Sequence, residues 1–226
     1  YIIDNYTKSE NKNIKLIYRG VDNSNYNKDY APSDKWLSDW YEQYPETKSA
    51  KLLTISGRIS PLKDIEKIIH LAKSIKDNSS HNFKILIAGE AQNKHLKYLK
   101  NLKNTIKYLG LSEDIYFLNF RKDIKDIYAI SSLAFNTSNK PESFGRSVLE
   151  PLSMGVPTIG YNRGGVKEIL DELYPFGGVT PGSDEQLLNK TLCILDGNEA
   201  NIKTNTKFIT SKMCSETLSF YKEILS

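Results

Sequence analysis

Glu142 and Glu150 stand eight residues apart in the segment PESFGRSVLE at 141–150, with Gly145 in a predicted turn between them. A loop that opens a helix can hold an anion on its free backbone N–H groups. Carboxylates beside it can accept hydrogen bonds from sugar hydroxyls. The segment therefore predicts a phosphate site next to a sugar site. The alternative is two surface carboxylates at a helix N-terminus, with Arg146 in an ordinary i, i+4 ion pair to Glu150.

Two cations follow an apolar run at 51–56 in the segment GRISPLK at 57–63. The planar fork of Arg58 and the compact charge of Lys63 both suit a diphosphate. The alternative is two surface cations at the start of a helix. Because cations are slightly unfavourable near a helix N-terminus, that position mildly favours a bound anion.

The elements that must position these residues alternate between short apolar runs and helical patterns. Strands are predicted at 51–56, 83–88, 115–118, 133–135, 156–160 and 177–179. Helical patterns begin at Pro61 and cover 93–109, 124–130, 146–154 and 164–170. This alternation predicts right-handed βαβ units. The expected fold is α/β, a Rossmann-like parallel sheet of about six strands with helices on both faces.

Ligands of such sheets bind outside the carboxyl ends of the strands. The segment 142–150 follows the fourth predicted strand, and Gly57-Arg58, Gly89-Glu90 and Asn119-Phe120-Arg121 follow the first three. Four loops from separate parts of the sequence are therefore expected to meet on one rim.

Two flanking segments complete the chain. Residues 1–50 are polar and aromatic with a predicted helix at 34–44, residues 51–180 form the predicted core, and residues 181–226 carry predicted helices at 184–195 and 211–225. Residue 1 is Tyr, so we expect a piece of a longer protein. The net charge of +4 is too small for the basic footprint of a nucleic-acid binder, although it is compatible with weak attraction to an anionic membrane.

Several classes of site are not favoured by the sequence. It contains neither a G-x-G-x-x-G nor a Walker motif, which disfavours a nicotinamide dehydrogenase and a P-loop NTPase. Its three histidines are scattered, so no metal site is predicted. Gly164-Gly165 is typical either of close backbone approach to a ligand or of helix–strand packing, and packing is slightly favoured.

The order of these motifs resembles the family-4 retaining glycosyltransferases of the GT-B fold. The matching segments are Gly57-Arg58 with Lys63, IAGE at 87–90, ESFG at 142–145, EPLSMGVP at 150–157 and GGVKE at 164–168. YRGVD at 18–22 resembles the segment that enters their second domain, and the resemblance covers residues 14–225. It implies one half of a GT-B fold, the donor-binding C-terminal half. The acceptor-binding N-terminal domain is then expected to be missing, and this chain alone to be inactive.

The resemblance implies which residues of this sequence correspond to the family's site residues, by matching positions in the motifs. The phosphate-binding Arg and Lys correspond to Arg58 and Lys63, the donor-sugar Glu to Glu142 and the ribose Glu to Glu150. Arg58, Lys63 and Glu142 are therefore the expected catalytic residues. The other residues expected to bind the donor, several through backbone N–H groups, are Gly57, Gly89, Glu90, Phe120, Arg121, Phe144, Gly145, Arg146, Ser147 and Glu150.

The resemblance implies transfer, with retention, of a hexose or N-acetylhexosamine from a nucleotide diphosphate sugar, with a UDP-sugar favoured. No obligatory metal or other cofactor is expected. The expected acceptor is a glycan or lipid-linked saccharide of bacterial O-antigen, capsule or lipopolysaccharide synthesis. The expected location is the cytoplasm, with peripheral association at the inner face of the membrane. A non-catalytic nucleotide-sugar binding module and a nucleotide-sugar epimerase of related fold remain alternatives.

Overall fold

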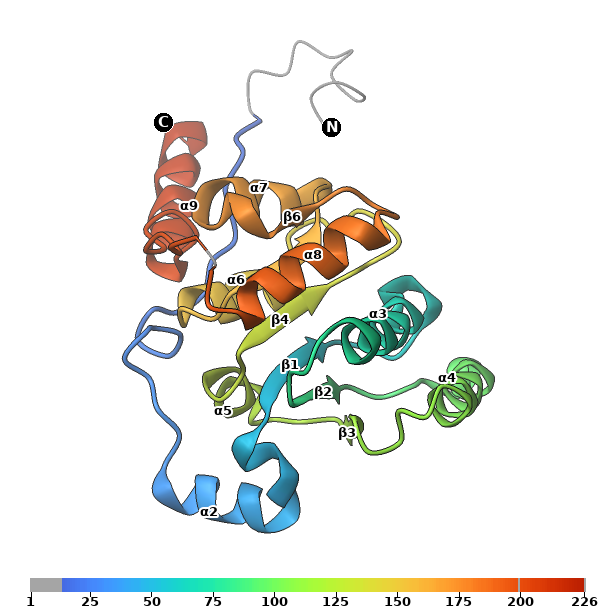
Figure 1. The fold of residues 1–226 in the computed structure, drawn as a ribbon. Coiled ribbons are helices and arrows are strands. Elements are labelled where there is room, and N and C mark those ends of the chain that lie inside the picture. Colours follow the sequence, from blue (N-terminus) through green and yellow to red (C-terminus); the bar gives the residue numbers. More distant parts are fainter. Residues whose placement is uncertain (1–13, 199, 226) are drawn as a thin grey trace.

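Six parallel strands form one sheet in the order β3-β2-β1-β4-β5-β6 in a computed structural model that describes residues 14–198 and 200–225 (Figure 1). In Figure 1 the sheet runs from β3 at the bottom to β6 at the top. The strands are β1 (Lys51–Ser56), β2 (Phe83–Ala88), β3 (Ile115–Asn119), β4 (Leu133–Asn136), β5 (Thr158–Tyr161) and β6 (Gly178–Val179). The order reverses beside β1, whose Ile55 pairs with Ile87 of β2 and Phe135 of β4. The loops after β1 and β4 therefore border the crevice where such sheets bind ligands.

The strands are short apolar runs because both faces of the sheet are covered. Leu53 and Ile55 face one cluster of buried side chains, and Leu52 faces another. All four residues of β4 are buried. Burial on both sides makes these runs continuous rather than alternating, as the sequence indicates.

Three helices cover one face of the sheet. They are α3 (Ile65–Asn78), α4 (Leu96–Tyr108) and α8 (Asp184–Leu195). In α3 the apolar residues recur at helical spacing, so Ile68, Ala72 and Ile75 are buried on one side. Leu102 of α4 and Leu187 of α8 join the same cluster. This cluster is the main core of the protein.

The opposite face carries α5 (Ile124–Ala129), α6 (Arg146–Ser153) and α7 (Gly164–Leu173). The helix α2 (Asp34–Gln43) lies beyond one end of β1, and α9 (Thr210–Leu225) lies beside α7 (Figure 1). Short 3-10 helices are η1 (Pro45–Ser49), η2 (Pro61–Lys63), η3 (Asn93–His95) and η4 (Pro175–Gly177). Helices on both faces of a six-stranded parallel sheet confirm the predicted fold class.

The bounds of several predicted elements differ in the structure, and two of these differences lie at prolines. Pro61 opens only the 3-10 turn η2, because Asp64 adopts a left-handed conformation at φ 49° and α3 begins after it. The predicted strand at 156–160 begins instead at Thr158. Pro157, which has no N–H to donate to a ladder, lies before the strand and only accepts a bond from the Ala134 N–H at 2.9 Å.

The flanking segments are joined to the core. Trp40 of α2 is buried with Leu52 and Leu86, and Val21 forms a parallel bridge with Ile209. Residues 1–13 of the predicted N-terminal segment lie outside the described residues. None of the helices in the described part of the chain combines the length and the apolar character that crossing a lipid bilayer demands.

A substitution at Gly165 tests how tightly α7 packs on the loop before α6. A Cβ there would lie 2.5 Å from the Phe144 carbonyl oxygen and 2.6 Å from its Cα. Alanine normally stabilises a helix relative to glycine. Here the close backbone contact outweighs that gain in helix stability. We therefore expect Gly165→Ala to lower the free energy of unfolding by about 2 kcal/mol or more in a denaturant titration. The control is Gly178→Ala, whose Cβ would meet nothing closer than 3.4 Å. Equal stability of the two variants would contradict this packing.

Candidate functional site

A cavity of about 630 Å³ opens at the carboxyl ends of β1 to β4. It is lined by most of the residues predicted from the sequence. These are Gly57, Arg58, Lys63, Gly89, Glu90, Phe120, Arg121, Glu142, Arg146, Ser147 and Glu150. The four predicted loops therefore meet on one rim.

Phe144 and Gly145 do not line this cavity. The Phe144 side chain turns the other way and packs edge-on against Phe208, with ring centroids 6.1 Å apart. Gly145 caps α6 in a left-handed conformation at φ 111°. Phe144 thus fixes the loop to the core by packing, and Gly145 allows the chain to reverse direction before α6 begins.

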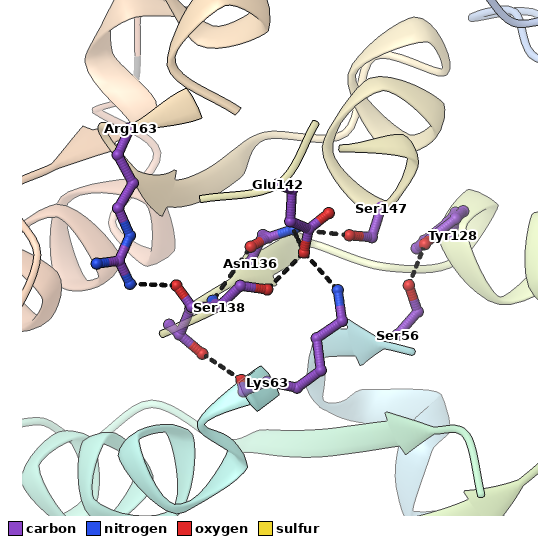
Figure 2. Close-up of polar contacts among 9 residues, drawn as sticks. Ser56, Lys63, Tyr128, Asn136, Ser138, Glu142, Ser147 and Arg163 are labelled. Atoms are coloured by element: carbon purple, nitrogen blue, oxygen red, sulfur yellow. Dashed lines mark hydrogen bonds and ion pairs between the residues drawn. The ribbon is translucent and has the colours of Figure 1, made fainter. Parts of the chain in front are cut away.

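Glu142 is the centre of the polar network in the cavity (Figure 2). Its Oε1 accepts hydrogen bonds from Lys63 Nζ at 2.5 Å, Ser138 Oγ at 2.5 Å and Asn136 Nδ2 at 3.1 Å. Asn136 also donates to Ser147 Oγ at 2.9 Å, which ties the network to the first turn of α6. The carboxylate is therefore held in one orientation by donors from two segments, the one after β1 and the one at the end of β4.

The protonation state of Glu142 follows from these contacts. Burial alone would raise the pKa of its carboxyl, but the hydrogen bonds from Lys63 and Ser138 outweigh burial and hold the pKa below its usual range. Glu142 is thus an ionised acceptor at neutral pH. It is poorly suited to act as a general base at that pH, because a base works best with a pKa near it.

Lys63 reaches Glu142 because the loops after β1 and β4 are bonded together. The Asn139 N–H donates to the Leu62 carbonyl at 2.7 Å, and Thr137 Oγ1 donates to the Lys63 carbonyl at 3.1 Å. Gly57 leaves room for the lysine, since a Cβ there would lie 3.1 Å from Lys63 Cε. Residues nearly eighty positions apart in sequence are in this way brought into contact.

The start of α7 supports the Glu142 loop from behind. The Gly165 N–H donates to the Glu142 carbonyl at 2.8 Å, and the Arg163 guanidinium donates to the Ser138 carbonyl (Figure 2). The close approach of Gly164-Gly165 is therefore to the chain's own backbone, which is the packing alternative of the sequence analysis.

Glu150 has the opposite environment to Glu142. Its side chain is 8% exposed, and Oε1 accepts from Arg146 Nε at 2.8 Å and Nη2 at 2.6 Å. Burial raises the pKa of Glu150, and Arg146 opposes that rise only in part. The i, i+4 ion pair expected as an alternative is present, and Arg146 is therefore bonded to a carboxylate.

The remaining cations differ in how far they are engaged. Arg121 donates to both oxygens of Asp123, at 2.8 and 2.6 Å, and stacks over Trp40. Arg58 is exposed and makes no hydrogen bond or ion pair within residues 14–198 and 200–225. Arg58 is thus available for an anion in the cavity, whereas Arg121 is already paired.

Gly89 brings the loops after β1 and β2 into direct contact. A Cβ at this position would lie 1.8 Å from the Gly57 carbonyl oxygen, so only glycine fits there. The adjoining Glu90 accepts a backbone bond from Ile59 at 2.9 Å. Phe120, which is 62% exposed, lies at the third loop.

Seven further cavity residues were not predicted from the sequence: Tyr26, Ser56, Ala88, Ala91, Gln92, Ile124 and Tyr128. Ser56 ends β1, so the rule that ligands bind at carboxyl ends could have found it. Tyr128 is buried within α5 and meets Ser56 Oγ at 2.5 Å, and burial raises the pKa of its hydroxyl. Tyr26 lies in the segment before α2 and carries no local signal.

The charges of the cavity suit an anion beside a polyhydroxyl group. Arg58 and Lys63 come from the segment after β1, and the carboxylates of Glu142 and Glu150 come from the segment after β4. Cations and a helix N-terminus bind phosphates, and ionised carboxylates bind hydroxyls. Across the described ranges, no three His, Cys, Asp or Glu side chains gather closely enough to hold a metal ion.

The sequence matches the family described as Glycosyl transferases group 1 over residues 38–211. It is 25% identical over 224 residues to N-acetyl-alpha-D-glucosaminyl L-malate synthase of Bacillus anthracis, covering 95% of this chain and 55% of that protein. It is 26% identical over 181 residues to the O-antigen biosynthesis glycosyltransferase WclY of Escherichia coli, covering 75% and 44%.

A similar solved structure is that of Anabaena Alr3699/HepE in complex with UDP and glucose. Its TM-score is 0.77 and its identity 28%, with 91% of this chain and 56% of that chain covered. The same protein has also been solved with UDP-glucose. The present chain thus spans about half the length of the relatives it matches.

Removing the Arg146 guanidinium tests the environment of Glu150. With Arg146→Leu, burial acts on the carboxylate without an opposing cation, and the pKa of Glu150 rises further. When the pKa of a carboxyl is higher in the folded state than in the unfolded state, the protein loses stability only at pH values above the pKa of the unfolded state. We therefore expect a loss of about 1 to 3 kcal/mol near pH 7.5 and a much smaller loss near pH 4, by chemical denaturation.

The control for this prediction is the same substitution in a Glu150→Gln background, where the pH-dependent part of the loss should vanish. A loss that is equal at both pH values would show that Arg146 acts through packing alone.

Proposed function

Since the chain belongs to the group 1 glycosyl transferases, we propose that its cavity binds the nucleotide diphosphate sugar donor of a glycosyl transfer reaction. The observation that carries this proposal is the placement of Arg58 and Lys63 together with Glu142 and Glu150 in one cavity at the switch point of the sheet. Its volume of about 630 Å³ lies within the range of small-molecule sites.

A UDP-sugar is the donor we favour, with a hexose or N-acetylhexosamine as the sugar. Support comes from the relative Alr3699/HepE, which has been solved with UDP-glucose. In the proposed pose the diphosphate lies at Arg58, Lys63 and the start of α6. Glu142 then faces the sugar, and Glu150 faces the ribose.

The chemical role of these residues follows from where charge develops. When the glycosidic bond to the diphosphate breaks, negative charge accumulates on the leaving oxygens. Arg58 is exposed and Lys63 is positioned by two loops, so both can stabilise that charge without an obligatory metal. The free oxygen of Glu142 orients the sugar. We propose retention at the anomeric carbon, as the family-4 resemblance implies.

The acceptor is proposed at the level of the whole protein. Because this chain spans about half of the relatives it matches, we assign acceptor binding to a domain outside it. A glycan or lipid-linked saccharide of bacterial surface polysaccharide synthesis fits the relative that acts in O-antigen biosynthesis. Transfer would then take place in the cytoplasm, at the inner face of the membrane.

Calorimetric titration of UDP tests the phosphate site. We expect Arg58→Ala/Lys63→Ala to weaken UDP binding by about 100-fold or more, because two charge-assisted contacts are lost. The matched control is Lys48→Ala/Lys51→Ala, which removes two exposed cations at the opposite end of β1. Unchanged affinity in the first variant would remove the phosphate assignment.

Glu142→Gln separates binding from turnover. The amide keeps the shape but loses the charge that orients the sugar and holds Lys63. We expect donor hydrolysis and transfer by the full-length protein to fall by about 100-fold. UDP affinity should stay equal or increase, since Lys63 is released from its carboxylate. Glu113→Gln, at an exposed position outside the cavity, is the control. Full activity of Glu142→Gln would favour a role for this residue in structure only.

A further inference from the structure

The helix α4 and its flanks form a segment of unusual charge. Residues 91–112 contain five lysines, Lys94, Lys97, Lys100, Lys103 and Lys107, and none of the chain's 27 carboxylates. All five lysines are exposed. In a chain whose net charge is only +4, this is a marked local separation of charge.

Four of the five lysines lie on the outer side of α4, and Lys94 lies in η3 just before it. Their spacing of three or four residues keeps them on one side of a helix, while Leu102 and Ile106 pack into the main core. A helix of thirteen residues is about 20 Å long, so the basic face extends over that distance. We call the exposed side of 94–108 the α4 basic face.

The neighbouring helix α3 shows the contrast. There Lys67 pairs with Asp184, Lys73 with Asp77 and Lys76 with Asp114. On the α4 basic face, no lysine forms an ion pair with any residue of the described ranges; Lys103 instead lies 5.7 Å from the centre of the Phe117 ring. Within the described residues these lysine charges have no acidic partner.

Two apolar side chains accompany the lysines. Leu96 at the start of α4 is 53% exposed, and Tyr108 at its end is 89% exposed. By helical spacing Leu96 lies one turn before Lys100, and Tyr108 lies three turns beyond Lys97, so both belong to the basic face. Lysines with an exposed leucine and tyrosine suit the headgroup region of a bilayer, where aromatic side chains lie at the interface.

We propose that the α4 basic face docks on a bilayer surface rich in anionic lipid. Each lysine close to such a surface is attracted by its negative potential, and the attraction falls off within a Debye length. The face is the outside of a helix at the periphery of the molecule (Figure 1). A face of this shape fits a flat membrane surface better than it fits a single polyanionic strand.

The position of α4 relates this contact to the cavity. Gln92 lines the cavity, and Lys94 begins the basic face two residues later. A membrane under α4 would therefore lie beside the cavity rim. The docking itself does not depend on the identity of the donor.

Cosedimentation of the chain with vesicles tests the proposal. We expect binding to vesicles of phosphatidylcholine with phosphatidylglycerol, weaker binding at higher salt, and none to phosphatidylcholine alone. Replacing Lys97, Lys100, Lys103 and Lys107 by Gln should weaken binding at least about tenfold. The control replaces four exposed lysines elsewhere, Lys48, Lys51, Lys203 and Lys212, and should bind within about twofold of the unaltered chain.

Folding of both variants is checked by their thermal unfolding midpoint, which surface Gln residues should leave unchanged. Equal loss of vesicle binding in both variants would show a nonspecific charge effect and overturn the proposal. Full vesicle binding by the α4 variant would also overturn the proposal. So would an unaltered chain that bound single-stranded RNA through α4 and did not bind vesicles. None of these outcomes depends on whether UDP binds, so the two proposals can fail separately.

Discussion

The reversal of strand order beside β1 is the constraint on which the rest of the structure depends. Because β1 pairs with both β2 and β4, the loops after β1 and β4 leave the sheet side by side and diverge around a crevice. The hydrogen bonds between these loops bring Lys63 to Glu142. If the two strands were separated in the sheet, the cations and carboxylates of the cavity could not face one another.

The two glutamates that flank the start of α6 show how environment assigns roles to identical side chains. Glu142 accepts three hydrogen bonds on one oxygen, which lowers its pKa although it is half-buried. Glu150 is more deeply buried and has Arg146 as its cation, so its pKa is raised. The first is a fixed anion facing the cavity. The ionisation of Glu150 depends on a single neighbour, Arg146. Arg146 therefore matters to the cavity through the carboxylate with which it is paired.

Much of this organisation could be predicted from the sequence, because it rests on local patterns. The apolar runs of β1 and β2 and the helical spacing of α3 predicted the layers, and the rule that ligands bind at carboxyl ends predicted the cavity rim. The rest could not be predicted in this way. Phe144 lies next to Gly145 in a loop that suits backbone binding, but its side chain is drawn into the core by Phe208, which is distant in sequence.

The sequence by itself determined the fold class, the sheet edge that carries the cavity and most residues that line it, because periodicity and strand–loop position are local properties. Only the tertiary structure decided which groups touch. It brought Lys63 to Glu142, whose carboxylate also accepts from Ser138 and Asn136, and it left Arg58 without a hydrogen bond to any described residue. The i, i+4 pair of Arg146 with Glu150, by contrast, is local and was already an alternative from the sequence. The tertiary structure also added Tyr26 and Tyr128 to the cavity. The contact of Lys63 with Glu142 joins residues far apart in the chain, and the burial and charge of the cavity residues exist only once the sheet and both helix layers have assembled.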